Sequence, residues 1–189
     1  MSLGVLVPKL PGADGGSVGV VHGPGTVMAM RRAAGERAID FLLERGRLER
    51  VAVDVEAACD VLLERAAKRL ETARAAMTGE DWEGAFANAY DVYRMAAEVL
   101  LLRQGLRATG GDGSHVVVED AVSGQFAGEI VGFSKARFER MRQGRHASQY
   151  FDPARPEKTD DDARWAVELA DGVLAATEEL RRSGRLDLY

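Results

Sequence analysis

Arginine, histidine and tyrosine side chains gather in one short stretch of the chain, residues 138–153. Its members that could take part in chemistry are Arg140, Arg142, Arg145, His146 and Tyr150. Guanidinium groups bind phosphate through paired hydrogen bonds, an imidazole titrates near neutral pH, and a phenol offers a hydroxyl group. These residue types in one window indicate a site that handles phosphate groups, with Arg140, Arg142 and Arg145 as the phosphate-binding residues.

The charge of the whole chain makes this window stand out. The 189 residues carry a formal net charge of −5, with 25 Lys and Arg against 30 Asp and Glu. A protein that coats nucleic acid needs a broad basic surface, so this composition excludes that class and leaves only a local contact. A solvated helix end, whose cations suit the helix dipole, is the simpler explanation of the same residues.

Helical spacing of apolar residues predicts the elements that position this window. A short amphipathic element, with Gly46 as a stop or a bend, is predicted from the spacing of Ala38, Phe41, Leu42 and Leu48. Asp54 is then predicted to cap a longer helix. The apolar stripe of that helix consists of Val55, Cys59, Leu62, Leu63, Ala66, Leu70 and Ala73.

The next helix is predicted to begin at a capping box of Thr78 and Asp81 and to end at Gly105. Aromatic residues at helical spacing on it are interpreted as core. They are Trp82, Phe86, Tyr90 and Tyr93. The same helix carries Tyr90, Asp91 and Arg94 within little more than one turn, which makes these three residues candidates for a supporting position beside the site.

A glycine-rich loop, residues 109–113, precedes a helix that we predict over residues 114–126. His115, at the start of this helix, is interpreted as a capping or packing residue. Beyond the cationic window, Thr159 and Asp162 form a second capping box that starts the last helix. Short joins between these helices favour an all-α fold, an antiparallel up-and-down bundle of four to five helices.

Composition divides the chain into parts. We expect a flexible Gly/Pro-rich arm over 1–27, a short helical lead-in over 28–52, the bundle over 53–182 and a tail over 183–189. Met28 and Met30 directly precede the first helical sequence and are alternative native starts.

The sequence is expected to show its compartment and its metal content through targeting segments and cysteine spacing. The sequence shows neither a signal peptide nor a run of about 18 apolar residues, so we expect a cytoplasmic protein without membrane contact. Cys59 is the only cysteine, which excludes an internal disulfide and a cysteine-based zinc site. We expect this residue in the core, and we expect no metal and no cofactor.

Three segments follow one another in a fixed order along the chain. They are the helix over residues 89–101 with Gln104-Gly105-Leu106 after it, the loop with Gly113-Ser114-His115, and Arg145-His146-Ala147-Ser148-Gln149-Tyr150. Together they resemble the bacterial HEPN domains, over roughly residues 53–180. The resemblance implies an up-and-down helical bundle, frequent homodimers and a polar groove at the dimer interface. It also implies toxin-antitoxin or antiviral defence roles, or partnership with a minimal nucleotidyltransferase.

The catalytic members of this family have an arginine, a polar residue after it, and a histidine four to six positions beyond. These residues form a metal-independent ribonuclease site. The resemblance puts Arg145 at the arginine and His146 at the polar residue, which leaves Tyr150 in the place of the histidine. Arg140 followed by His146 also satisfies the spacing. The presence of Tyr150 where the histidine would stand favours a degenerate site.

Metal-free RNA cleavage needs a base for the 2′-hydroxyl, a cation beside the phosphorane and an acid for the leaving oxygen. Arg145 could stabilise the charge and His146 could move the proton. Tyr150 could donate a hydrogen bond or act as an acid. Positions five apart on a helix lie about 140° out of line. Arg145 and Tyr150 would therefore meet only if the helix ends between them or a second subunit supplies one of them.

Three functions remain open from the sequence. The preferred one is a degenerate HEPN module that binds a nucleotide, RNA or a protein partner through an Arg-rich groove at a dimer interface. The first alternative is a metal-independent endoribonuclease of toxin or antiviral defence type, using Arg145 and His146. The second is a helical interaction module without a ligand.

Overall fold

The computed structural model describes residues 35–110, 113–149, 153–154 and 156–189. The predicted arm over residues 1–27, the alternative starts at Met28 and Met30, and Tyr150 lie outside the described residues.

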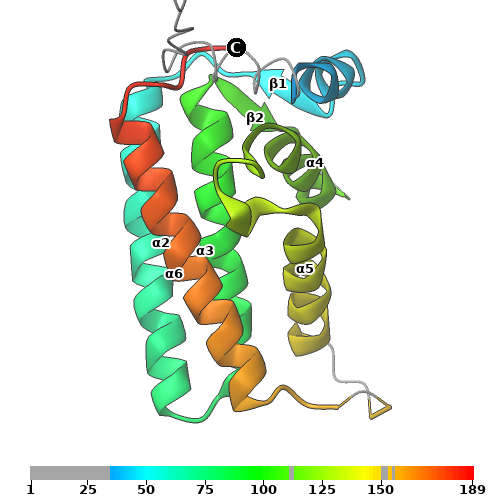
Figure 1. Ribbon diagram of the computed structural model, residues 1–189, viewed down its shortest axis with the longest axis vertical. Helices are drawn as coiled ribbons and strands as arrows, with labels where there is room; N and C mark the ends of the chain where they lie inside the picture. The colour runs from blue at the N-terminus through cyan, green and yellow to red at the C-terminus, as the bar shows by residue number, and fades with distance from the viewer. Residues whose placement is uncertain (1–34, 111–112, 150–152, 155) are drawn as a thin grey trace, which may run out of the picture.

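Two long helices form the centre of the fold (Figure 1). α2 spans Val55–Thr78 and α3 spans Trp82–Arg103. Asp54 caps α2 as predicted, because its carboxylate accepts a hydrogen bond from a backbone amide of the first turn. The predicted capping box at Thr78 is wrong. α2 continues through Thr78, and Asp81 caps α3 with its own carboxylate.

A two-stranded antiparallel sheet closes one end of the bundle. β1, Leu48–Arg50, pairs with β2, Leu106–Ala108. The sequence analysis did not predict these strands, because three residues are too few to establish a period of two. Leu48 therefore belongs to a strand and not to the helical element before Gly46.

The helical segment over residues 35–44 lies beside this sheet. The chain turns after it at Gly46, where φ is +61°, as the predicted stop requires. One member of the predicted apolar stripe is wrong, since the Phe41 side chain is 53% exposed. Leu42, another member of that stripe, is buried as predicted, and Ile39 is buried as well.

The second half of the described chain is helical. Its elements are α4 at Ser114–Phe126, the short 3-10 helix η1 at Val131–Phe133, α5 at Lys135–Gln149 and α6 at Asp160–Arg182. The bounds of α4 agree with the prediction. Thr159 and Asp162 form the predicted capping box, in which the Thr159 side chain accepts from the Asp162 amide and the Asp162 carboxylate accepts from the Thr159 amide.

The long helices α2, α3, α5 and α6 alternate in direction, while α4 crosses near the sheet end (Figure 1). α3 is the central helix and packs against α2, α4, α5 and α6. The all-α, antiparallel up-and-down bundle predicted from the sequence is confirmed.

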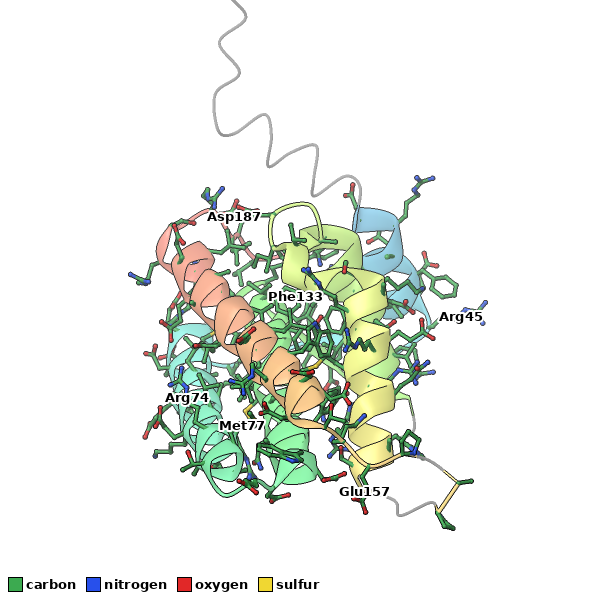
Figure 2. All side chains as sticks on the ribbon, turned by 60° about the horizontal axis from the view of Figure 1, so that its bottom comes forward. Arg45, Arg74, Met77, Phe133, Glu157 and Asp187 are labelled. Atoms are coloured by element: carbon green, nitrogen blue, oxygen red, sulfur yellow. The ribbon has the colours of Figure 1, made fainter. Side chains whose placement is uncertain are left out.

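An aromatic cluster joins α3, α5 and η1 in the interior. Tyr93, Phe133 and Phe138 have ring centroids 4.8 to 5.5 Å apart, and Figure 2 shows Phe133 among the helices. Farther along α5, Gly144 lies so close to the ring of Phe86 that a Cβ on Gly144 would overlap it. These contacts hold α5 close to α3.

Cys59 lies in the core, as predicted, with none of its surface exposed. Its thiol lies 3.8 Å from the Val99 carbonyl oxygen, across the α2–α3 contact. Within the described residues, no helix combines the length and the apolar character needed to cross a bilayer.

Candidate functional site

Tyr90 and His115 are joined by a hydrogen bond between α3 and α4. The Tyr90 hydroxyl lies 2.6 Å from Nδ1 of His115, and the two ring centroids are 5.8 Å apart. Gly113 precedes α4 with a φ of +81°, a left-handed conformation that glycine adopts without strain. The chain can therefore enter α4 sharply, with His115 in the first turn beside α3.

Three guanidinium groups surround this pair. Arg145 of α5 places its guanidinium carbon 5.3 Å from the centre of the Tyr90 ring. Arg94 of α3 and Arg142 of α5 also act electrostatically on both Tyr90 and His115. We call Arg94, Arg142 and Arg145 the arginine cluster. Two helices, α3 and α5, thus supply the positive charge of the site.

Each member of the arginine cluster has a carboxylate partner. The pairs are Arg94–Glu98 at 2.7 Å, Arg142–Glu119 at 3.5 Å and Arg145–Asp91 at 3.5 Å between nitrogen and oxygen. The two 3.5 Å distances exceed the roughly 2.7–2.9 Å of a charge-assisted hydrogen bond. The three positive charges of the arginines and the three negative charges of their carboxylate partners cancel. A neutral His115 adds no charge to the site.

Burial and the arginine cluster shift the ionisable groups of the site. Burial raises the pKa of Tyr90 to about 12, although the nearby arginines favour its ionised form. Burial lowers the pKa of His115, and the arginine cluster lowers it further. Burial also raises the pKa of Glu98 and of Glu119 against the effect of their arginine partners. At neutral pH the phenol is protonated and the imidazole is neutral.

The site residues expected from the sequence do not all lie together in the structure. Those found around His115 are Tyr90, Asp91, Arg94, Arg142 and Arg145. Arg140 lies on the α6 side of α5, where its guanidinium carbon is 3.7 Å from the centre of the Trp165 ring. His146 is exposed on α5, and Tyr150 lies outside the described residues.

His115 is the site residue to which the sequence analysis gave no functional role. Its partner Tyr90 stands 25 positions earlier, and no periodic pattern links the middle of one helix with the first turn of the next. The one local signal was its place directly after Gly113 and Ser114, at a helix start. The pair forms because the start of α4 lies against the polar residues of α3, which is a tertiary contact.

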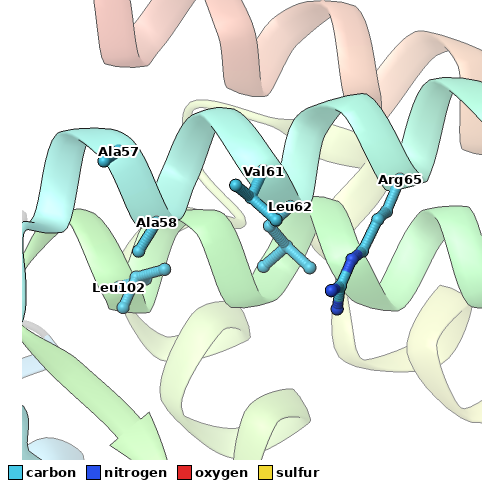
Figure 3. A pocket seen from close by; sticks show the side chains of 6 residues that line it. All are labelled: Ala57, Ala58, Val61, Leu62, Arg65 and Leu102. Atoms are coloured by element: carbon cyan, nitrogen blue, oxygen red, sulfur yellow. The ribbon is translucent and has the colours of Figure 1, made fainter.

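A shallow groove of about 390 Å³ lies elsewhere, on α2 and the end of α3 (Figure 3). It is lined by Ala57, Ala58, Val61, Leu62, Arg65 and Leu102. Arg65 is the one charged residue of this lining, and none of the six is a nucleophile or an acid–base group. The groove therefore does not share the chemistry of the arginine cluster.

The chemistry that the site offers is anion binding. The arginine cluster supplies guanidinium donors, and the Tyr90–His115 pair supplies a hydroxyl and an imidazole. Among the described residues, no group of three or more His, Cys, Asp and Glu side chains could hold a metal ion.

Comparison with known proteins identifies the family of this chain. The model of the HEPN domain family matches residues 59–180, which include the whole arginine cluster, Tyr90 and His115. No curated protein and no solved structure was found to match the chain.

Proposed function

Because this chain belongs to the HEPN domain family, as its sequence resemblance indicated, we propose that it binds a nucleotide or RNA through phosphate groups. One observation carries this proposal. Arg145 lies over the Tyr90 ring, Arg142 pairs with Glu119 one turn along α4 from His115, and all three guanidinium groups of the arginine cluster act electrostatically on the Tyr90–His115 pair. A guanidinium presents paired donors that match two phosphate oxygens, so several of them around one point suit a phosphate group.

The long ion pairs of the cluster favour exchange with a ligand. Arg142 and Arg145 each lie 3.5 Å from their carboxylate partners, and both side chains are partly exposed. Exposed or loosely paired charges contribute little to stability, about 0–1 kcal/mol for each pair. A phosphate that forms shorter, charge-assisted hydrogen bonds can therefore compete with Asp91 for Arg145 at small cost. Glu119 is 4% exposed, so its pair with Arg142 is not a surface pair, and a ligand there shares Arg142 with it.

Binding without cleavage is the preferred form of this function. Tyr90 is a poor base, because burial raises its pKa to about 12. His146 follows Arg145 directly on α5, so the two side chains leave the helix about 100° apart. Metal-independent RNA cleavage by Arg145 and His146 is the second candidate. It is favoured by the exposure of His146 immediately next to a member of the arginine cluster.

We include a homodimer in the proposal, with the arginine cluster facing a groove between two copies. A nucleotidyltransferase or another toxin-antitoxin component is the proposed class of protein partner. Light scattering after size-exclusion chromatography, with and without RNA, measures the mass of the assembly. A monomeric mass under both conditions would contradict the dimer.

The function is tested by fluorescence polarisation with a labelled RNA pool, in EDTA and at two salt concentrations. Arg145→Ala is expected to weaken binding by about 10- to 100-fold, since one charge-assisted hydrogen-bond donor contributes about 1.5–3 kcal/mol. Arg164→Ala, an exposed residue of α6 that pairs with Asp160 in its own helix, is the matched control and should bind like wild type.

The same samples are then examined for cleavage on a denaturing gel. Intact RNA together with binding that depends on Arg145 supports the proposed function. Cleavage that both Arg145→Ala and His146→Ala abolish would establish the ribonuclease instead. Equal binding by wild type and Arg145→Ala would place RNA binding away from the arginine cluster and overturn the proposal. No binding at either salt concentration would leave a helical interaction module without this ligand.

A further inference from the structure

We propose that Tyr90 and His115 contact the ligand, and that the site takes a terminal phosphate monoester together with one proton. This inference rests on the proposed function, because it concerns the same arginine cluster. It goes beyond that function by naming the chemical class of the ligand and by giving a binding role to His115, which lies outside the Arg145–His146–Tyr150 motif.

The charges around His115 come from every helix that packs on it. They are Asp91 and Arg94 of α3, Glu119 of α4, and Arg142 and Arg145 of α5, with Arg47 close to Gly113 at the start of α4. Tyr90 of α3 is titratable but uncharged. The charges of the arginine cluster and its carboxylate partners cancel. A phosphodiester brings one negative charge to this site, whereas a terminal phosphate monoester brings about 1.5 to 2. The additional negative charge favours a further cation beside the arginines, which His115 can provide.

Protonation of His115 and binding of the phosphate favour each other. In the free protein, burial and the arginine cluster lower the pKa of His115 and keep its imidazole neutral. A bound phosphate puts negative charge among the same arginines, which offsets their effect and raises that pKa. Between the free and bound pKa values, affinity rises as pH falls, by up to about tenfold per pH unit for one linked proton.

Protonation of His115 reverses the direction of its hydrogen bond with Tyr90. In the neutral tautomer that carries its proton on Nε2, Nδ1 of His115 accepts from the Tyr90 hydroxyl at 2.6 Å. When a proton from solvent binds Nδ1, that N–H donates to the Tyr90 oxygen instead. The phenolic hydrogen is then available to a phosphate oxygen. Tyr90 keeps its own proton throughout, because burial raises its pKa to about 12.

The test is isothermal titration calorimetry with a short 5′-phosphorylated oligoribonucleotide, near pH 6.5, in two buffers of different ionisation enthalpy. The difference in heat between the buffers gives the number of protons taken up on binding. Wild type is expected to take up more protons than His115→Gln, by a difference approaching one. The titrations of the phosphate itself, of Glu98 and of Glu119 are common to both proteins, so the difference reports His115.

Further variants separate a ligand contact from a structural role. Arg164→Gln, on the exposed face of α6, should keep the proton uptake of wild type. Tyr90→Phe keeps the ring beside Arg145 and removes only the hydroxyl, so it should weaken binding of the phosphorylated RNA by roughly tenfold, the effect of one lost hydrogen bond. The melting temperature of each variant, measured without ligand, shows whether it folds. The same RNA with a 5′-hydroxyl should bind at least about tenfold more weakly, since it lacks the charge-assisted contacts of the terminal phosphate.

The outcomes distinguish this inference from the function on which it rests. Equal proton uptake by wild type and His115→Gln, or equal affinity for the two RNAs, would overturn the inference. The proposed function would still stand if Arg145→Ala weakened binding of either RNA. Absence of binding by wild type to both RNAs would overturn the function and the inference together.

Discussion

The ring of Phe86 on α3 occupies the space that a side chain at position 144 of α5 would need. A Cβ on Gly144 would overlap two ring atoms of Phe86 and crowd a third, and Phe86 is itself 2% exposed. Arg145, the next residue, lies over the Tyr90 ring one turn farther along α3. The close approach at Gly144 therefore sets the distance between α5 and α3 at the point where the arginine cluster forms.

Gly144→Ala is predicted to move α5 away from α3. The overlap with Phe86 should lower the free energy of unfolding by about 1–3 kcal/mol, as overpacking of a core does. The displacement should also weaken phosphate binding, because Arg145 shifts with the helix. Urea unfolding and the polarisation assay measure the two effects. Gly172→Ala in α6 is the matched control, since no atom lies within 4 Å of its Cβ position. It should stabilise the protein by about 0.5–1 kcal/mol. Equal stabilities of the two variants would contradict the prediction.

Glu119→Gln is predicted to strengthen phosphate binding. Glu119 is 4% exposed and competes with a ligand for Arg142, from which it lies 3.5 Å away. Removing its charge leaves the guanidinium available to the ligand. We expect about fivefold higher affinity, which corresponds to roughly 1 kcal/mol for one ion pair. Asp120→Asn is the control, because Asp120 pairs with Lys135 on the surface. A lower affinity of Glu119→Gln for the phosphate ligand than that of wild type would show that Glu119 orients Arg142 rather than competing for it.

Thr159→Ala is predicted to destabilise the protein by about 0.5–2 kcal/mol, because it removes the capping box at the start of α6. Thr78→Ala should change stability by less than about 0.5 kcal/mol. Thr78 lies in the last turn of α2, and its hydroxyl donates only to the Arg74 carbonyl of the same helix. Thermal unfolding of both variants measures the contrast, and equal melting temperatures would refute the assigned caps.

Cys59 is predicted to resist alkylation in the folded protein. Burial raises the pKa of its thiol to about 11, above the ordinary value of 9.0. At pH 9 roughly one percent of the folded thiol is ionised, against about half in the unfolded chain. Reaction with a thiol reagent at pH 9 should therefore be at least about fiftyfold slower than in urea and should accelerate as the pH rises toward 11. Equal rates in the two states would place Cys59 on the surface.

Much of the fold could be predicted because its signals are local. The capping box at Thr159, the apolar spacing of three and four, and the glycines lie within a few residues of the helix ends that they fix. Thr159 and Asp162 predicted α6, and residues 114–126 were predicted as a helix in spite of three consecutive valines. Thr78 was a misleading signal because two side-chain acceptors precede α3. Thr78 lies inside α2, whereas Asp81 directly precedes α3 and caps it with its carboxylate.

The site could be predicted only in part, because its contacts join distant segments. Arg142 and Arg145 were identified from the density of charge in one window, and Arg94 from its place near Tyr90. Arg140 belongs to the same window but lies beside Trp165, since helix rotation separates neighbours that a charge count groups together. The role of His115 depends on how α4 crosses α3, which no spacing within either helix records.

Both tryptophans of the chain lie at the end of the bundle away from the sheet. Trp82 begins α3, and Trp165 lies in the second turn of α6 under the Arg140 guanidinium. Intrinsic fluorescence is therefore an optical reporter of that end alone. Fraying of β1 and β2 at the opposite end should leave tryptophan emission unchanged while far-ultraviolet dichroism already changes. Unfolding curves recorded with the two signals would separate wherever the sheet end melts first.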